Sequence, residues 1–254
     1  MHPPETYQRA LRLHASGLSF TQVVRQVGLP RGTVAHWIYG SRARQTAKLR
    51  AEQPTRACAG CTRDPGDLDD PRAYAYLLGQ YLGDGHLVTS ARVPVLRVYC
   101  ANAYPAIIQE CRQAMIAVRA KSVSIVPKIG CVGVQSYSTH WPHLFPQHGP
   151  GPKHRRRIGL SDWQEAVVAV HPDALLRGLI HADGCRSINR VTVRGTQYAY
   201  PRYLFANESA DILGICGAAL DRIGARWRFN RRNSISVATR ADVALLDEFI
   251  GPKT

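Results

Sequence analysis

The sequence predicts an α+β protein in which a small all-helical unit precedes two copies of one αββαββα repeat. Three observations predict this architecture: helical periodicity near the N-terminus, a motif that occurs twice, and strand-like alternation of apolar residues after each copy. The predicted boundaries are 1–42 for the helical unit, 43–70 for a linker, 71–159 for the first repeat and 160–254 for the second.

Three short helices are predicted in the N-terminal unit, over residues 6–15, 20–27 and 30–39, with Gly17 and Gly28 between them. Two helices joined by a tight glycine turn resemble a helix-turn-helix, whose later helix enters the major groove of DNA. The residues of that helix expected to meet base edges are Arg31, Thr33 and His36. A helical bundle with no role in DNA binding is the alternative.

The linker contains Cys58 and Cys61, which supply two of the four ligands of a structural zinc site. No second pair with suitable spacing follows, so the sequence favours free thiols and leaves zinc at these residues as the less favoured alternative. The chain has seven cysteines, an odd number that does not indicate a disulfide scaffold. A reducing, cytoplasmic location is expected, and association with the nucleoid if the source is prokaryotic.

The duplicated motif reads LLGQYLGDG over residues 77–85 and LRGLIHADG over residues 176–184. Downstream, the tripeptide Gly-Pro-Lys occurs twice, so that 69 residues separate Asp84 from Lys153 and 70 separate Asp183 from Lys253. Predicted strands cover 86–92, 95–100, 122–126 and 131–137 in the first repeat, and 187–194, 198–206, 226–230 and 234–238 in the second. Predicted helices cover 104–118, 141–145, 209–223 and 240–250. Two similar sheets related by a pseudo-dyad are therefore expected.

Small residues recur four positions apart in both motifs, where they share one helix face and allow two backbones to approach closely. These residues are Gly79, Gly83, Gly178 and Ala182. The motif helices are expected to pack together and to end at Asp84 and Asp183, with the next glycine in the conformation of a helix C′ residue. Two carboxylates brought together repel each other unless cations lie between them, and hard oxygen ligands beside phosphate favour magnesium.

These residues resemble the LAGLIDADG, or dodecapeptide (DOD-type), homing endonucleases. The second motif matches LAGLIDADG at seven of nine positions and the first at four, and the resemblance extends from about Pro71 to the end of the sequence. It implies a saddle of eight strands that lies in the major groove and a magnesium-dependent hydrolase that cuts both strands. The sixth motif position, often Asp in the family, is Leu82 in one copy and His181 in the other.

Functional residues follow from this resemblance. Asp84 and Asp183 correspond to the aspartates that bind two or three catalytic Mg²⁺ ions, and Lys153 and Lys253 to lysines that assist nearby. The implied activity is site-specific cleavage of double-stranded DNA. The chain is expected to act as a monomer with internal pseudo-twofold symmetry.

The charge supports a nucleic-acid partner. The net charge is +15, and 28 of the 33 basic residues are Arg, whose planar guanidinium binds phosphate and guanine with two hydrogen bonds. No apolar run is long enough for a membrane span. Period-two spacing places Arg186, Arg190 and Arg194 on one strand face, and Arg226 and Arg228 on one face of another. The opposite face of that second strand, with Phe229, is expected in the core. The remaining candidates for DNA contact are Arg92, Arg97, Lys128, Gln135, Arg155 and Arg156.

Three competing functions stay open. A DNA-binding transcriptional regulator that keeps the scaffold without cutting is the main alternative, because a helix-turn-helix also accompanies a LAGLIDADG scaffold in sporulation-type regulators. An intein is disfavoured, because the sequence has no N-terminal nucleophile with splicing blocks and no C-terminal His-Asn pair. A helix–sheet protein without nucleic acid is disfavoured by the charge and the paired motifs.

Overall fold

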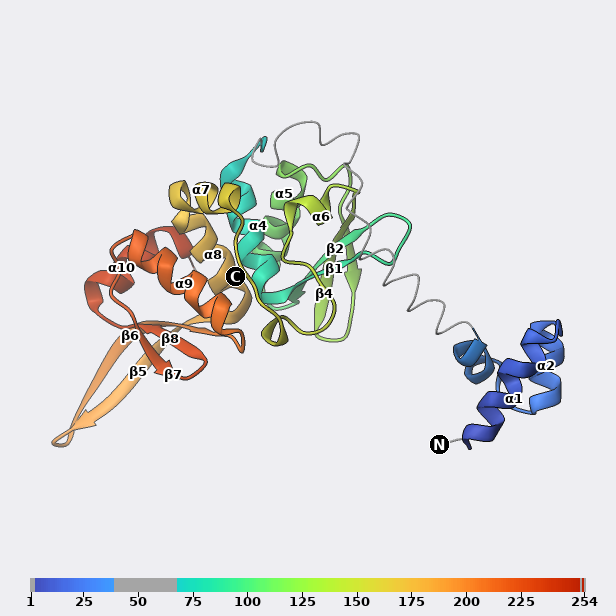
Figure 1. Ribbon diagram of the computed structural model, residues 1–254. Helices are drawn as coiled ribbons and strands as arrows, with labels where there is room; N and C mark the ends of the chain where they lie inside the picture. Colours follow the sequence, from blue (N-terminus) through green and yellow to red (C-terminus); the bar gives the residue numbers. More distant parts are fainter. Residues whose placement is uncertain (1–2, 39–67, 252, 254) are drawn as a thin grey trace. The chain divides into compact units, whose positions relative to one another are not determined.

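A computed structural model describes residues 3–38, 68–251 and 253 of the chain (Figure 1). The chain divides into two compact units, Met1–Ala57 and Cys58–Thr254, and each is considered by itself. Cys58, Cys61 and the predicted linker as far as residue 67 lie outside the described residues. Among the helices in those ranges, none is both long and apolar enough to cross a membrane.

The first unit contains α1 (Pro4–Ala15), α2 (Phe20–Val27) and a further helix at residues 31–38. A capping box starts α2, because the backbone N–H of Ser19 donates to Gln22 Oε1 at 2.8 Å. The helix ends at Gly28, whose φ of 69° is the left-handed conformation that glycine adopts without strain. The small core consists of Ala10, Val23, Val34 and Ile38.

The second unit contains the two repeats with the predicted order of elements. The first repeat comprises α4 (Pro71–Asp84), β1 (Gly85–Val88), β2 (Val95–Ala101), α5 (Pro105–Ala117), β3 (Ser124–Pro127), β4 (Cys131–Tyr137) and α6 (Trp141–Leu144). The second comprises α8 (Pro172–Asp183), β5 (Gly184–Val193), β6 (Thr196–Ala206), α9 (Ala210–Arg222), β7 (Arg228–Arg231), β8 (Ser234–Val237) and α10 (Arg240–Ile250). Between them lie a short 3₁₀ turn, η1 (Lys153–Arg155), and α7 (Asp162–Val170), a helix that the sequence analysis did not predict.

Each repeat forms its own four-stranded antiparallel sheet, with strand order β1-β2-β4-β3 in the first and β5-β6-β8-β7 in the second. The two orders are the same when the strands of each repeat are numbered in sequence order. This agreement confirms the predicted fold class and the internal duplication.

Helices cover one face of each sheet: α5 packs against β2 and β4, and α10 and α9 pack against β6 and β8 (Figure 1). The alternation along β2 follows from this packing, since Leu96 and Val98 are fully buried whereas Arg97 and Tyr99 between them keep solvent contact. In register, His86 lies opposite Arg97, and Leu87 opposite Leu96. Each sheet therefore has a helix-covered face and a second face with polar side chains.

The motif helices α4 and α8 pack directly against each other. A Cβ at Gly79 would lie 2.5 Å from the carbonyl oxygen of Leu175, and a Cβ at Gly178 would overlap the carbonyl oxygen of Tyr76. Gly83 contacts Ala182 in the same way at the end of the pair. Small residues are thus required because the two backbones touch.

The glycines after the two aspartates differ from the expected C′ conformation. Gly85 has φ −84° and ψ 150°, and Gly184 has φ −109° and ψ 172°, so both are extended and begin a strand. Their small size serves close packing instead, because a Cβ at Gly85 would lie 2.8 Å from the Tyr81 carbonyl oxygen and one at Gly184 2.7 Å from the Ile180 Cα.

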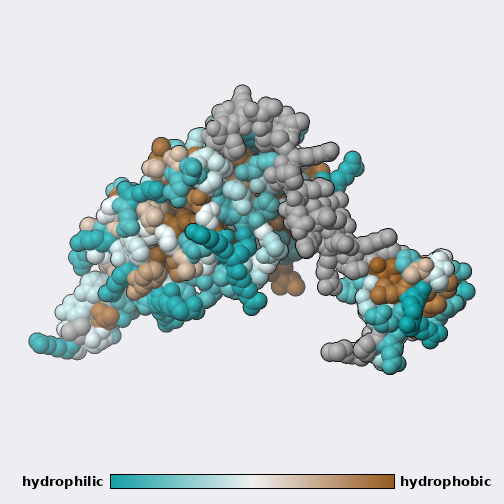
Figure 2. Space-filling model, in the orientation of Figure 1, coloured by the Kyte–Doolittle hydropathy of each residue, from teal (hydrophilic) through white to brown (hydrophobic). Residues whose placement is uncertain are grey.

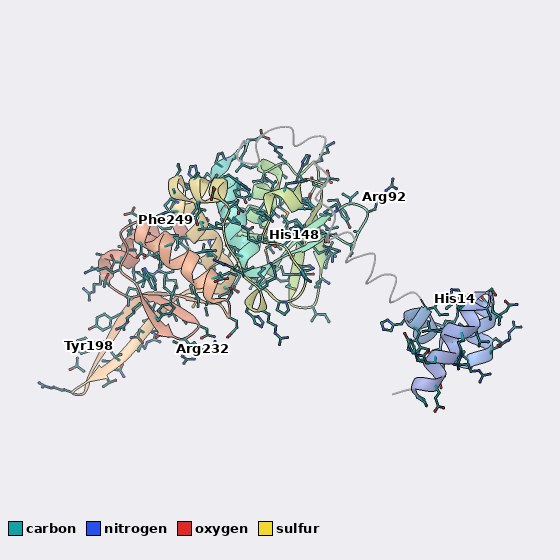
Figure 3. The ribbon with its side chains drawn as sticks, in the orientation of Figure 1. His14, Arg92, His148, Tyr198, Arg232 and Phe249 are labelled. Carbon is teal, nitrogen blue, oxygen red and sulfur yellow. The ribbon has the colours of Figure 1, made fainter. Side chains whose placement is uncertain are left out.

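Three strand details also differ from the prediction. β1 ends at Val88, so Arg92 lies in the connection to β2, and Figure 3 shows it there. Arg194 and Gly195 have φ values of 50° and 82° and form the tight turn between β5 and β6. Arg194 therefore lies in the turn and not in the strand predicted over 187–194. Phe229 was expected in the core, yet it is 57% exposed because β7 is an edge strand.

The β-hairpins that follow the two motif helices, β1–β2 and β5–β6, differ in length. β1 pairs with β2 over four residues, and β4 pairs with β2 along its whole length. β5 pairs with β6 over ten residues, but β8 reaches only residues 203–206 of β6. Residues 187–202 therefore form a two-stranded ribbon that projects beyond the sheet (Figure 1), and we call it the β5–β6 ribbon.

Candidate functional site

Asp84 and Asp183 are the last residues of α4 and α8, and the packing of these helices brings their carboxyl groups to one place. Asp183 Oδ2 would lie 3.1 Å from a Cβ at Gly83, so this carboxylate faces the end of the other motif helix. Asp183 Oδ2 also accepts a hydrogen bond of 2.7 Å from Asn207 Nδ2. The two motif aspartates thus belong to one site on the axis between the repeats.

Both aspartates have a raised pKa. Protein atoms crowd the Asp84 carboxyl although it reaches solvent, and this desolvation, followed by the charge of Asp183, raises its pKa to about 6. Desolvation also raises the pKa of Asp183, against the hydrogen bond from Asn207. With its pKa near 6, the Asp84 carboxyl is mainly ionised at neutral pH, and it lies beside a second carboxyl group.

Lys153 and Lys253 approach this site from the ends of the two repeats. Lys153 Nζ donates to the carbonyl oxygens of Tyr81, of Leu82 at 3.1 Å and of Gly83 at 2.8 Å, all in the last turn of α4. Desolvation lowers the Lys153 pKa to about 8, while the charges of Asp183 and Asp84 act in the opposite direction. The lysine therefore satisfies helix-end carbonyls and lies within the electrostatic reach of both carboxylates.

Lys253 is held less firmly than Lys153. Its Nζ makes one long contact, 3.4 Å to the Ala182 carbonyl oxygen in the last turn of α8, and lies 5.7 Å from the centre of the Tyr104 ring. Desolvation lowers the pKa of Lys253, and the charges of Asp84 and Asp183 oppose that change. The two lysines occupy equivalent places with unequal contacts.

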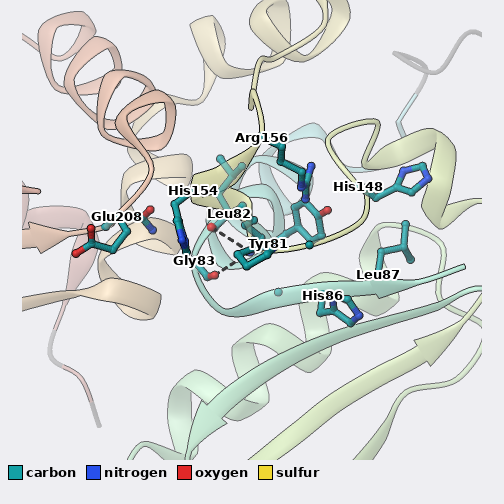
Figure 4. A pocket seen from close by; sticks show the side chains of 15 residues that line it. Tyr81, Leu82, Gly83, His86, Leu87, His148, His154, Arg156 and Glu208 are labelled. Atoms are coloured by element: carbon teal, nitrogen blue, oxygen red, sulfur yellow. Dashed lines mark hydrogen bonds between the residues drawn. The ribbon is translucent and has the colours of Figure 1, made fainter. Parts of the chain in front are cut away.

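A cleft of about 340 Å³ opens beside the end of α4 (Figure 4). Residues from the first repeat and from its connection to the second form most of its wall. Asn207 and Glu208, which precede α9, complete the wall. Its ionisable and polar wall residues are Tyr81, His86, His148, Lys153, His154, Arg156, Asn207 and Glu208. Sequence analysis missed His86 and Asn207 as site residues, and only their positions just after the motif and before α9 could have indicated them.

The donor chemistry of the site fits a hard divalent cation. Asp84 and Asp183 provide carboxylate oxygens, and their mutual repulsion is the pattern that a cation relieves. In the ranges that the structure describes, no group of three or more His, Cys, Asp or Glu side chains is placed to share a metal ion. Any ion would therefore need further ligands from backbone, water or substrate, as is usual for Mg²⁺.

In the first sheet, two predicted DNA-contact residues share the face away from the helices. Arg97 Nε donates to Gln135 Oε1 at 3.0 Å across the β2–β4 pair. Lys128 Nζ lies 5.8 Å from the centre of the Tyr99 ring, next to them on this face. The open face of this sheet is therefore basic and polar.

In the second sheet, the predicted Arg face of β5 is the helix-side face. Arg186 Nε and Nη2 donate to the two carboxylate oxygens of Asp247 in α10, at 2.7 and 2.9 Å. Arg226 was predicted to share a strand face with Arg228, but it precedes β7 (Arg228–Arg231), and its Nε donates to Asp242 Oδ2 at 3.0 Å. Arg190 shares the face of Arg186 and is exposed on the ribbon, and Arg228 lies on the open face opposite Ser236.

The open face of the β5–β6 ribbon carries residues that sequence analysis did not select. Arg202 lies opposite Ser187 in the register, and Arg202 Nε and Ser187 Oγ are buried atoms with no hydrogen-bond partner among the described residues. The Tyr198 and Tyr200 rings stack with centroids 6.1 Å apart. Tyr198 is labelled on the ribbon in Figure 3, and the exposed tip of the ribbon is hydrophilic in Figure 2.

The remaining candidates lie apart from these faces. Arg155 is exposed on η1, and Arg156 Nη1 donates to the Gln147 carbonyl oxygen at the cleft. In the first unit, Arg31 and His36 are exposed on the helix at residues 31–38, and Thr33 is partly buried. The guanidinium of Arg31 lies 5.2 Å from the centre of the Phe20 ring.

Comparisons with known proteins give low similarity. No family model and no curated protein matches the sequence. Among solved structures, a mesophilic variant of the homing endonuclease I-DmoI is 15% identical over 72% of this chain and 98% of its own, with a TM-score of 0.46. The LAGLIDADG meganuclease I-AabMI bound to uncleaved DNA is 13% identical over 69% of this chain and 82% of its own, with a TM-score of 0.45. The N-terminal LAGLIDADG domain of WhiA is 13% identical over 72% of this chain and 83% of its own, with a TM-score of 0.43. Sequence identities and TM-scores this low carry no conclusion about function.

Proposed function

We propose that this chain is a site-specific endonuclease of double-stranded DNA, of the LAGLIDADG type, that uses divalent metal. The observation that carries the proposal is the meeting of two equivalent aspartates, Asp84 and Asp183, at the ends of two helices that a duplication created. A structural role does not require two carboxylates that raise each other's free energy. A metal-dependent reaction on phosphate does.

Each group has a role in phosphodiester hydrolysis. Mg²⁺ bound there would lower the pKa of a water and stabilise charge on the leaving oxygen. Asp84 and Asp183 supply carboxylate oxygens, Asp84 being mainly ionised above pH 6, and the Asn207 amide orients Asp183. Lys153 and Lys253 place ammonium groups beside the carboxylates, where they stabilise the developing charge on a phosphate.

The DNA surface of the proposal is the open face of the two sheets. Arg97, Gln135 and Lys128 in the first sheet and Arg228 and Arg202 in the second are positioned for phosphate or base edges. A two-stranded ribbon fits the major groove, so the β5–β6 ribbon extends this surface at one end. We place Arg31, Thr33 and His36 of the first unit in a separate contact with the same duplex.

The experiment that tests the proposal uses the full chain and a plasmid library that includes the flanking sequence of its own gene. We expect linear product with Mg²⁺ and none with chelator. Asp84→Asn and Asp183→Asn should each lower the cleavage rate by about a thousandfold or more, because a neutral amide is a poor ligand for Mg²⁺. DNA affinity measured in Ca²⁺ should stay within about threefold of that of the unmodified protein, since the proposed DNA contacts are made by other residues, on the sheets.

Asp221→Asn provides a matched control, because Asp221 lies on α9 and its Oδ1 accepts from Trp227 Nε1 at 2.7 Å, away from the motif helices. This variant should cut at the rate of the unmodified protein. Specific binding without any Mg²⁺-dependent cut would contradict the nuclease and support the second candidate.

The second candidate is a DNA-binding regulator that does not cut. The observation in its favour is that Lys153 Nζ donates to three carbonyl oxygens at the end of α4, a contact that stabilises this helix end without any metal. For this candidate, Asp84→Asn leaves all DNA-dependent behaviour unchanged. The two candidates are therefore separated by one variant in two assays.

A further inference from the structure

Two polar residues of α8 replace two leucines of the equivalent helix. Arg177 and His181 stand four residues apart on α8, where α4 carries Leu78 and Leu82 at the corresponding motif positions. Both leucines are fully buried, and the His181 side chain is 1% exposed. A buried polar group such as His181 is costly unless it is hydrogen-bonded, and the Arg177 side chain beside it is 30% exposed. The partners of the two side chains therefore indicate what they do.

The hydrogen bonds of His181 have one consistent direction. Its Nε2 lies 3.0 Å from the Ile250 carbonyl oxygen, and since a carbonyl only accepts, Nε2 carries the proton and donates. Nδ1 then accepts from the Tyr76 hydroxyl at 3.2 Å, and that oxygen accepts from Gln80 Nε2 at 2.9 Å. A neutral imidazole thus connects α4 to the last residue of α10.

Arg177 makes a second connection to the same place. Its Nε and Nη2 donate to the two carboxylate oxygens of Glu110 in α5, at 2.5 and 2.8 Å. Its Nη1 donates to the Phe249 carbonyl oxygen at 2.7 Å and to that of Ile250. The last carbonyls of α10, which have no partner within the helix, are therefore satisfied by two side chains of α8.

The position of the end of α10 determines where the backbone of Lys253 lies. Only two residues separate Ile250 from Lys253, and Gly251 has φ 68°, with 3.3 Å between a Cβ there and Arg177 Nη1. Among the described residues, Lys253 Nζ makes one hydrogen bond, the long contact to the Ala182 carbonyl oxygen, and lies near the Tyr104 ring. Lys153 needs no such support, because three carbonyl oxygens hold its ammonium group directly.

We propose that Arg177 and His181 are positioning residues for Lys253: they hold the end of α10 on α8 and so keep the Lys253 ammonium group beside Asp183. This inference rests on the proposed nuclease function. It assigns a role to the departure of the second motif from the family pattern at its sixth position. The equivalent leucines of α4 have no such role.

The test is a double-mutant cycle on the full chain with a cleavable DNA site and Mg²⁺. His181→Leu, which copies the first repeat, is expected to lower the single-turnover cleavage rate about tenfold through misplacement of Lys253, with DNA affinity in Ca²⁺ unchanged within about twofold. In a Lys253→Met background the same substitution should change the rate by less than about twofold, because the group it positions is gone. In a Lys153→Met background the tenfold loss should persist.

Arg177→Lys is the second variant, since it keeps the charge but loses the planar fork that reaches both Glu110 and the carbonyls. We expect the same dependence on Lys253. Arg222→Lys is the matched control: Arg222 pairs with Glu165 at 3.0 Å on the surface of the same repeat, and cleavage should be unchanged. Circular dichroism and the unfolding temperature check that each variant is folded.

Amide hydrogen exchange of a peptide from residues 245–254 gives a readout that needs no cleavage. It should be about tenfold faster in His181→Leu and Arg177→Lys than in the unmodified protein, and unchanged in Arg222→Lys. Equal rate losses with and without Lys253, or unchanged exchange, would overturn the proposal. If the unmodified protein binds DNA but never cuts it, the nuclease function fails, and exchange alone then decides whether α8 holds the end of α10.

Discussion

The two repeats share one topology and differ in what each adds to the common site. Strand order, helix order and the place of the aspartate are the same in both. The first repeat holds its lysine by three carbonyl oxygens and ends its hairpin at the sheet, whereas the second holds its lysine by one and extends its hairpin into a ribbon. The two copies therefore keep the packing of α4 against α8, whereas the contacts of their lysines and the lengths of their hairpins differ.

The helix pair should be the most symmetric and most sensitive part of this comparison. Gly79→Ala and Gly178→Ala are each expected to lower the free energy of unfolding by roughly 3 kcal/mol, because the new Cβ would meet backbone atoms that cannot move aside. Denaturant unfolding measures the change. Gly214→Ala in α9 is the control: no atom lies within 4 Å of a Cβ there, so the helix propensity of alanine should stabilise the protein by about 0.5 to 1 kcal/mol. Tolerance at one motif glycine alone would show that the repeats do not pack symmetrically.

The lysines should be unequal. Lys153→Met is expected to slow cleavage about a hundredfold, as the loss of one well-placed cationic donor does, and Lys253→Met about tenfold, because its ammonium group is less constrained. Single-turnover assays with the protein in saturating excess over DNA measure both rates, and the exposed Lys121→Met is the control. Equal losses would mean that the different contacts in the two repeats have no catalytic consequence.

The ribbon should make the DNA footprint asymmetric. Replacing residues 190–199 by Asn-Gly removes four cross-strand pairs and joins Asn189 to Tyr200, which already lie opposite each other. At about 3.4 Å per residue and per base pair, the footprint should retreat by about four base pairs at one end, and affinity should fall about tenfold as Arg190 and Arg194 are lost. Hydroxyl-radical footprinting in Ca²⁺ measures both boundaries. A retreat at both ends, or at neither, would argue against ribbon contact with DNA.

The charge of Asp84 should have the smallest effect, and it concerns stability without metal. Because the folded-state pKa of about 6 exceeds the ordinary value of 3.8, the folded state binds more protons between these values, and stability falls as pH rises through that interval. After allowance for solvent screening, Asp84→Asn should stabilise the protein at pH 7 in chelator by about 1 kcal/mol, or about 2 to 4 °C in Tm. Thermal unfolding at pH 4 and pH 7 checks this, since the gain should vanish at pH 4.

The sequence was informative wherever a rule acts on neighbours along the chain or on a repeated pattern. The duplicated motif, glycine spacing and alternation along the strands were sufficient for the repeat order, the two sheets and the place of Asp84 and Asp183 at helix ends. Period-two spacing correctly grouped Arg186 with Arg190 on one strand face. It could not tell that α10 covers this face, because Asp247 lies 61 residues away in the sequence.

What the sequence determined by itself was the duplication, because a repeat is a property of residue order. Tertiary structure decided which face of each strand is open, how firmly each lysine is held, and why α8 carries Arg177 and His181. These depend on contacts between distant elements, such as the carbonyls of Ile250 and the carboxylate of Glu110. Local patterns specify what a residue can bind, and only the fold brings its partner within hydrogen-bond distance.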